Sequence, residues 1–132
     1  MTTFALDTNI LSCLLKNDEL LFSMLDAETD KGNMFIVPPV AYYEIKRGLM
    51  AVNASSQLRL FDALCRRLYV GSMTIAEWST AAKIYADLRR QGTLIEDADI
   101  FIAAFCLVGG YSLVTRNVKH FIRIEGLKIT SW

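Results

Sequence analysis

The sequence predicts an α/β domain with a mainly parallel sheet of four to five short strands and helices on both of its faces. Two observations predict it: short apolar runs of strand length recur along the chain, and segments with helical spacing of apolar residues lie between them. Short apolar strands suit a parallel sheet, which is covered on both faces. The 132 residues contain no repeat, low-complexity tract or linker, so we expect one domain over residues 1–132.

The first third of the chain predicts two strands, each leading into a helix. Residues 4–6 are a strand ending at Asp7-Thr8-Asn9, a capping cluster from which a helix begins. Asn17-Asp18 ends that helix and caps a second one over about residues 19–29. Residues 34–37 are a second buried strand, because the run is too short for a helix.

Two further helices occupy the middle of the chain. Pro38-Pro39 opens the first, which runs to about Ala51, because the first turn of a helix tolerates proline. The second begins at Ser55-Ser56 and ends near Leu68, where residues 68–70 are a candidate for a short paired strand.

The last third predicts two helices and two strands. Thr74 and Glu77 match a capping box that opens a long helix ending at Gln91-Gly92. We expect one buried face on it, made of Ile75, Trp78, Ala82, Tyr85 and Leu88. A helix over residues 97–107 is closed by a double glycine, and strands follow at 111–115 and 127–130.

Composition restricts the kinds of protein this chain can be. Hydrophobic residues make up 53% of it and charged residues 21%, which describes a folded globular protein with apolar surface left over for a subunit or partner interface. The formal net charge is zero, so binding to nucleic acid would depend on a local basic patch or a bound metal. No signal peptide or membrane-spanning run is recognisable, and we expect a soluble, cytoplasmic protein without membrane contact.

Cysteine and histidine give no sign of a nucleophilic or zinc site. Cys13, Cys65 and Cys106 are far apart and lie in apolar stretches, so we expect free, buried thiols. His120 is the only histidine and lies in a loop-like stretch, where we expect a solvated surface position.

Acidic and polar residues from distant segments converge at one predicted sheet edge. Asp7 ends the first strand, and residues 115–117 (Thr-Arg-Asn) follow the third. Glu44 lies two turns into the helix after the second strand, and Asp97 and Asp99 open the helix that leads into the third. Ligands of open α/β sheets bind beyond the carboxyl ends of the strands, so this edge is the candidate site.

A cluster of carboxylates at that edge points to a hard divalent cation. Carboxylates packed together repel one another, and a cation such as Mg²⁺ relieves the repulsion while retaining positions for water and substrate phosphate. Such a site can hydrolyse a phosphoester without a histidine.

At this point the sequence resembles the PIN-domain ribonucleases, and among them the VapC toxins of bacterial VapBC toxin–antitoxin pairs. The resemblance rests on Leu6-Asp7-Thr8-Asn9-Ile10, on Glu44, on Asp99 three residues before Ile102-Ala103-Ala104, and on Leu113-Val114-Thr115-Arg116-Asn117 followed by Phe121 and Gly126-Leu127. Each motif alone is weakly specific, but all of them occur in order from Thr3 nearly to Trp132.

The resemblance implies a PIN-like three-layer α/β/α fold and an endoribonuclease that depends on Mg²⁺, with Mn²⁺ as a substitute. Carried over by position, Asp7, Glu44 and Asp99 are the acidic metal site. Many PIN domains have a fourth acid where this chain has Asn117, which we expect to orient a water and to weaken any second metal site. Glu96 is at most an outer acid, and a solvated loop position explains it better.

The residues around these acids have simpler roles open to them. Asp7 also suits a helix cap, and Glu44 a solvated helix position. Thr8 and Thr115 are candidates for bonds to the carboxylates or for turn roles, and we expect Asp97 to cap its helix. Basic residues that RNA phosphates could contact are Lys46, Arg47, Arg66, Arg67, Arg89, Arg90 and Arg116. Cations near helix C-termini are expected from the helix dipole alone, and this explains the basic pairs better than contact with RNA does.

The resemblance also implies partners: an RNA substrate (a tRNA or a ribosomal RNA loop), a VapB-like antitoxin, and a second copy in a homodimer. Leu14, Leu15, Leu20, Leu21 and Phe22 are candidates for a groove that takes an antitoxin helix, although the core could bury them instead. We expect Trp78 and Tyr85 to pack in the core or a dimer.

Two rival functions stay open at this stage. An aspartate-nucleophile phosphatase also begins with an acid after its first strand, but Asn9 stands where a second aspartate is needed. The other rival is a catalytically weak or inactive PIN-like module that binds RNA or protein, which Asn117 leaves room for.

Overall fold

A four-stranded parallel sheet forms the centre of the computed structural model, which describes residues 1–132. The strands are β1 (Thr3–Leu6), β2 (Met34–Ile36), β3 (Ser112–Val114) and β4 (Ile129–Thr130). Their spatial order is β2-β1-β3-β4, with Ala5 opposite both Ile36 and Leu113. The sequence predicts all four strands and their parallel arrangement, with bounds that differ by one or two residues.

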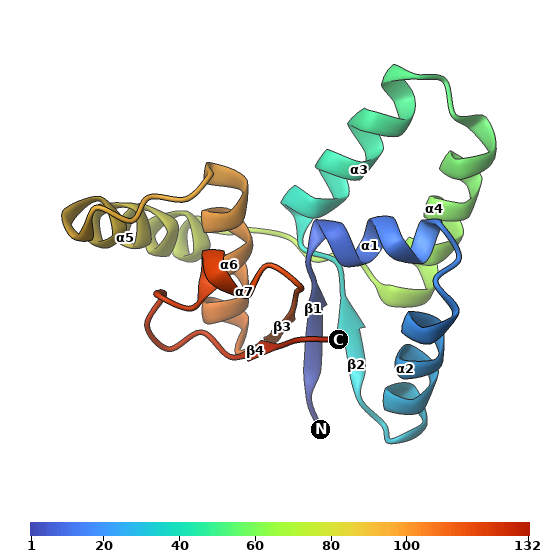
Figure 1. Ribbon diagram of the computed structural model, residues 1–132, viewed down its shortest axis with the longest axis horizontal. Coiled ribbons are helices and arrows are strands. Elements are labelled where there is room, and N and C mark those ends of the chain that lie inside the picture. Colours follow the sequence, from blue (N-terminus) through green and yellow to red (C-terminus); the bar gives the residue numbers. More distant parts are fainter.

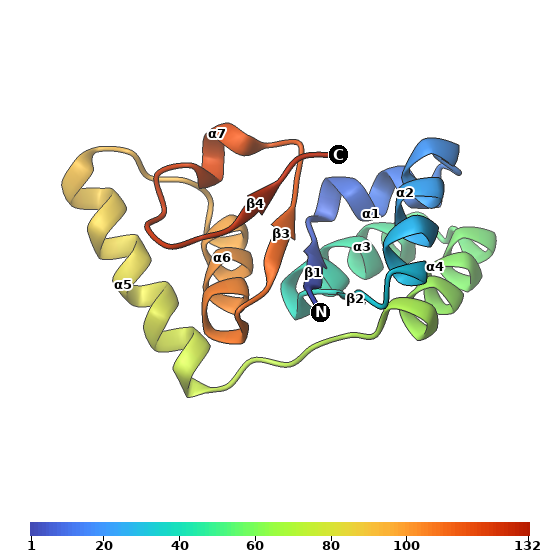
Figure 2. The same ribbon diagram turned by 90° about the horizontal axis from the view of Figure 1, so that it is seen from below.

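Seven helices flank this sheet in an α/β/α arrangement. They are α1 (Thr8–Leu15), α2 (Glu19–Asp30), α3 (Pro39–Ala51), α4 (Ser55–Leu68), α5 (Ile75–Gln91), α6 (Asp97–Gly109) and α7 (Val118–Phe121). Figures 1 and 2 show α1 to α4 gathered beside β1 and β2, and α5 to α7 on the side of β3 and β4. No helix is long and apolar enough to cross a membrane.

Local signals in the sequence place most helix ends. Asp7 and Asp18 are the N-caps of α1 and α2, and each side chain accepts a backbone N–H. Pro39 opens α3, and Thr74 with Glu77 forms the full capping box of α5. Gly92 and Gly110 end α5 and α6 in the left-handed conformation that glycine adopts without strain.

The core consists of buried side chains from the sheet and the helices that cover it, including Leu6, Leu11, Leu21, Phe61 and Ile102. Gly71, in the extended connection between α4 and α5, lies so close to Phe105 that a Cβ there would be 2.4 Å from the ring. Val70 in the same connection forms only a single parallel bridge with Val37, so the predicted strand at 68–70 is reduced to one residue pair.

The buried face predicted for α5 is right only at Leu88, which is buried. The helix also buries Glu77, Ala81 and Ile84, and it leaves the other predicted residues, Ile75, Trp78, Ala82 and Tyr85, exposed. The sequence of α5 contains two apolar stripes with helical spacing, and only one of them can face the core. The stripe with the smaller side chains, Ala81, Ile84 and Leu88, packs against the core. Trp78, on the other stripe, packs on Phe101, edge to face at 5.0 Å between ring centroids.

Two smaller expectations also need correction. Asp97 is the first helical residue of α6, and the cap position belongs to Glu96, which makes no side-chain capping bond; Asp97 is therefore not the cap. The stretch after Asn117, expected as a loop, contains the short helix α7. The three cysteines are free as expected, with Cys65 and Cys106 buried and Cys13 half-buried.

Candidate active site

Asp7 stands at the carboxyl end of β1 and is almost fully buried, with 3% of its surface exposed. Its Oδ1 accepts the backbone N–H of Thr8 at 2.8 Å, so the acid is also the N-cap of α1. Its Oδ2 accepts the hydroxyl of Thr115 at 2.7 Å. Burial raises the pKa of Asp7, and repulsion from Asp99 adds to that rise, while the two hydrogen bonds oppose it.

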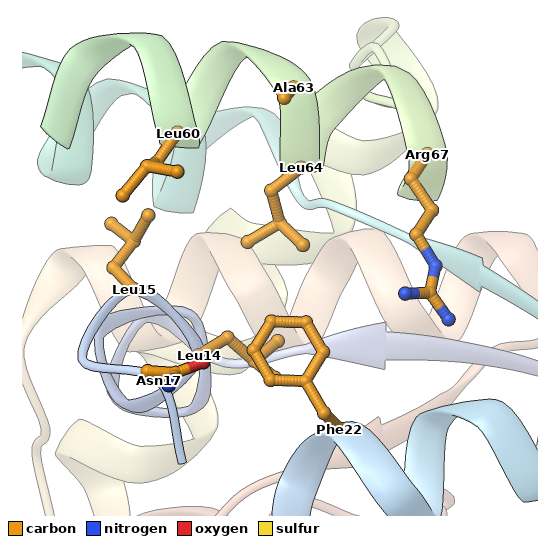
Figure 3. Close-up of a pocket in the computed structure, with 8 residues that line it drawn as sticks. All are labelled: Leu14, Leu15, Asn17, Phe22, Leu60, Ala63, Leu64 and Arg67. Atoms are coloured by element: carbon orange, nitrogen blue, oxygen red, sulfur yellow. The ribbon is translucent and has the colours of Figure 1, made fainter. Parts of the chain in front are cut away.

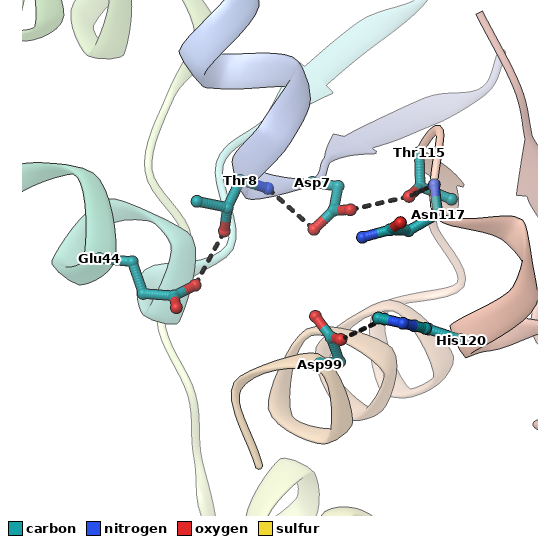
Figure 4. Close-up of polar contacts among 7 residues, drawn as sticks. All are labelled: Asp7, Thr8, Glu44, Asp99, Thr115, Asn117 and His120. Carbon is teal, nitrogen blue, oxygen red and sulfur yellow. Dashed lines mark hydrogen bonds and ion pairs between the residues drawn. The ribbon is translucent and has the colours of Figure 1, made fainter. Parts of the chain in front are cut away.

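Thr115 links the ends of the two central strands. It follows β3, is fully buried, and donates its hydroxyl to Asp7 while accepting the backbone N–H of Asn117 at 2.9 Å. The backbone N–H of Asp7 donates to the Val114 carbonyl at 3.0 Å, which holds the same two strand ends together. Thr115 thus fixes both the Asp7 carboxylate and the turn that presents Asn117 (Figure 4).

Asp99 lies in the first turn of α6 and is bonded to a residue from the far end of the chain. Its Oδ2 is 2.9 Å from Nδ1 of His120, on α7, and its side chain is 17% exposed. Burial raises the pKa of Asp99; His120 opposes the rise, and Glu96 and Glu44 reinforce it. His120 is exposed as expected, but its ring is also bonded to a carboxylate of the candidate site, which the sequence did not predict.

Glu44 is hydrogen-bonded to Thr8, the residue that follows Asp7 in the sequence. On α3, its Oε1 accepts the hydroxyl of Thr8 at 2.9 Å, and its Oε2 is 4.0 Å from the Arg47 guanidinium. Figure 4 shows the Asp7, Asp99 and Asn117 side chains pointing toward the space between them, with Glu44 beside it and directed at Thr8. The structure therefore places all four residues that the sequence singles out at this edge of the sheet, but Glu44 does not join Asp7 and Asp99 in one set of metal ligands.

The positions of the carboxylates limit how many of them could bind one cation. No three acidic, histidine or cysteine side chains are close enough together to ligate one ion. Asp7 and Asp99 repel each other across the space, and Glu44 repels Asp99, which is the electrostatic situation that a divalent cation relieves. Two carboxylates completed by waters are a normal ligand set for Mg²⁺, so the residues present fit that ion.

Most of the predicted basic residues lie in ion pairs or apart from the acids. Lys46 binds Asp62 at 3.0 Å, and Arg90 binds Asp87 at 2.9 Å. Arg116 donates to the Trp132 carbonyl and lies 3.7 Å from Asp18. Arg67 pairs with Asp26, and Arg89 lies in the last turn of α5 beside the Tyr85 hydroxyl. Arg47 is the one that lies against a site residue.

His120 is the site residue that sequence reasoning missed. The sequence around it gives no periodic signal, because α7 is only one turn long and Asn117 precedes it as the N-cap. Asp97, in contrast, is exposed at the start of α6 and makes no bond to the other acids.

The sequence and the structure of this chain both match known proteins. Residues 4–127 match the PIN domain. The chain is 38% identical to ribonuclease VapC1 of Methanocaldococcus jannaschii over 65% of its own length and 62% of that relative's, and 35% identical to ribonuclease VapC1 of Rickettsia felis over 70% and 72%. The solved structure of DNA-bound VapBC from Salmonella typhimurium superposes with a TM-score of 0.90 at 26% identity, covering 100% of this chain and 99% of that one.

Proposed function

The chain belongs to the PIN-domain family, and we propose that it is a metal-dependent endoribonuclease, the toxin of a toxin–antitoxin pair. The observation that carries the proposal is the convergence of the buried Asp7 carboxylate and the half-buried Asp99 carboxylate beyond the carboxyl ends of a parallel sheet. The relatives named ribonuclease VapC support the reaction class.

The proposed cofactor is Mg²⁺, with Mn²⁺ as a substitute, because the candidate donors are all oxygen and the Asp7 and Asp99 carboxylates repel each other. When bound, such an ion supplies Lewis-acid stabilisation of a phosphate and makes a neighbouring water more acidic. Asp7 and Asp99 would hold it.

The remaining residues have roles that follow from their contacts. Thr115 donates to Asp7 and so favours the ionised carboxylate that a cation needs. Glu44 is tied to Thr8 by Oε1, which suits a group that orients a water or substrate hydroxyl better than a direct ligand. The Asn117 amide points toward the space between the two aspartates and would position the attacking water. In-line attack on the phosphorus would leave a 5′-phosphate and a 3′-hydroxyl.

We further propose that an apolar pocket of about 490 Å³ between α1, α2 and α4 takes a helix of a VapB-like antitoxin (Figure 3). Its lining is Leu14, Leu15, Asn17, Phe22, Leu60, Ala63, Leu64 and Arg67. Of the five predicted groove residues, Leu14, Leu15 and Phe22 line this pocket. Leu21 is buried in the core, and Leu20 is exposed outside the pocket. An amphipathic helix laid in an apolar groove is a common mode of recognition.

A second copy of the chain is the proposed partner for the outer stripe of α5. Ile75, Trp78 and Tyr85 are exposed there, and Leu94 is exposed just beyond the end of the helix. Large apolar side chains grouped in this way are typical of homodimer interfaces.

The test is cleavage of total bacterial RNA by antitoxin-free protein in Mg²⁺, in Mn²⁺ and in EDTA, beside Asp7→Asn. We expect discrete fragments with 5′-phosphate ends in either metal, and none in EDTA or with the variant. A folded protein that binds Mn²⁺ but cleaves no RNA would contradict the proposal and favour the non-catalytic RNA- or protein-binding module.

A further inference from the structure

A polar pocket adjoins the acidic site on the side of Glu44, and we propose that it binds the RNA nucleotide next to the scissile phosphate. The inference rests on the proposed ribonuclease function. The pocket lies between α1 and α3, with Gln57 of α4 at its end, and has a volume of about 400 Å³. That size is within the roughly 300–1,000 Å³ typical of small-ligand sites.

The pocket and the acidic site share a wall. Thr8 and Glu44 both line the pocket and are joined by a hydrogen bond of 2.9 Å. This pair therefore separates the pocket from the acidic site. Thr8 is also the residue whose N–H binds Asp7. A strand with one phosphate at Asp7 and Asp99 therefore has its neighbouring nucleotide beside the Thr8–Glu44 pair.

Two cations of the pocket are placed to bind phosphate. Lys16, at the C-terminal end of α1, is exposed and forms no ion pair. Arg47 is also exposed, with its guanidinium 5.1 Å from the Tyr43 ring centroid and 4.0 Å from Glu44. Because the chain has zero formal net charge, RNA must be attracted by local positive charge. Lys16 and Arg47 supply that charge next to the acidic site.

The rest of the lining suits a sugar and a base. Ser12 and Gln57 are half-buried and their side chains are hydrogen-bonded to no other residue, so their hydroxyl and amide are free to bind the polar edge of a base. Leu15 and Leu49 supply apolar surface, and a Cβ at Gly48 would meet nothing within 4 Å, so the backbone is open there. Glu44 is the only acid in the pocket, which makes a second metal site a poor alternative.

Binding of a fluorescent single-stranded RNA dodecamer of mixed sequence tests the assignment, with Asp99→Asn as the uncleaving background. Lys16→Gln, alone and with Arg47→Gln, is compared with Lys31→Gln, a matched control on an exposed lysine at the end of α2. At about 0.1 M salt we expect Lys16→Gln to weaken binding about threefold and the pair about tenfold. The salt slope should fall by about 0.7 for each phosphate that the protein no longer neutralises.

Two further measurements separate this assignment from general effects. In the protein with intact acids, Lys16→Gln should raise KM and leave kcat within about twofold, because a subsite contact binds ground state and transition state alike. Its Mn²⁺ affinity should equal that of the unaltered protein. A double variant that binds the dodecamer as tightly as the Lys31→Gln control would overturn the subsite while the nuclease stands. No RNA binding by the Asp99→Asn background, with no cleavage by the unaltered protein, would overturn both.

Discussion

Replacing Thr115 with valine tests whether the buried hydroxyl supports the charge on Asp7. Valine has nearly the same shape, so the fully buried site keeps its packing. The change removes the 2.7 Å hydrogen bond to Asp7 and the acceptor for the Asn117 N–H. The hydrogen bond to a charged group is worth about 1.5–3 kcal/mol and the neutral one about 1 kcal/mol, so we expect a loss of about 2–4 kcal/mol in unfolding free energy at neutral pH.

The loss should depend on pH in a definite direction. The Thr115 bond lowers the pKa of Asp7, although burial keeps that pKa above its ordinary value in the unaltered protein. Because the valine variant lacks the opposing bond, the pKa of its Asp7 lies higher still. A raised acid pKa contributes stability at low pH that is lost as pH rises through the folded pKa, and the variant loses more. The difference between the two proteins should therefore widen from about pH 4 to about pH 8.

Urea denaturation of both proteins in EDTA across that pH range measures this difference, with Thr115→Ser as the control that keeps the hydroxyl. In thermal scans near neutral pH the valine variant should melt roughly 8–16 °C lower, at about 4 °C per kcal/mol for a chain of this size. A valine variant as stable as the serine variant at every pH would refute the reasoning, because the hydroxyl would then contribute nothing to the charge on Asp7.

Three other perturbations have expected outcomes. Asp7→Asn removes a buried charge with a raised pKa, so in EDTA at neutral pH it should stabilise the fold by about 1 kcal/mol, with the gain vanishing at low pH; an unchanged or lower urea midpoint contradicts this. His120→Ala removes the ring that orients Asp99 and should weaken Mn²⁺ binding by about tenfold in calorimetry, with the melting temperature nearly unchanged. Phe61→Ala empties a fully buried position stacked on Tyr42 and should cost about 3–5 kcal/mol by urea denaturation, whereas a loss under about 1 kcal/mol would mean that the site collapses.

The parts of the fold that could be predicted from sequence are those specified by short-range signals. Asp7, Asp18, the Thr74–Glu77 box and the glycines after α5 and α6 all act within a few residues of the helix end that they define. The placing of Asp7, Glu44 and Asn117 at one sheet edge followed from the predicted strands, because Asp7 and Asn117 follow two of them and Glu44 lies on the helix after a third.

What could not be predicted depends on packing between distant segments. The choice between the two apolar stripes of α5 is made by the surface of α6, which the sequence of α5 does not contain. The His120–Asp99 bond joins residues 21 positions apart and requires the one-turn helix α7, which is too short to leave a periodic pattern. Asp97 has the residue type of a cap, but the turn before α6 puts Glu96 in that position.

The central claim is that Asp7 and Asp99 hold the divalent ion on which RNA cleavage depends. Its most direct test is the rate of RNA cleavage as Mg²⁺ is titrated into metal-free protein, for the unaltered chain and for Asp99→Asn. We predict saturable activation of the unaltered protein and a loss of at least about 100-fold in the variant, because loss of a group that only supports a metal ligand already costs about 10- to 100-fold and Asp99 would be a ligand itself. Cleavage at the same rate in EDTA, or an Asp99→Asn variant that responds to Mg²⁺ as the unaltered protein does, would contradict the account.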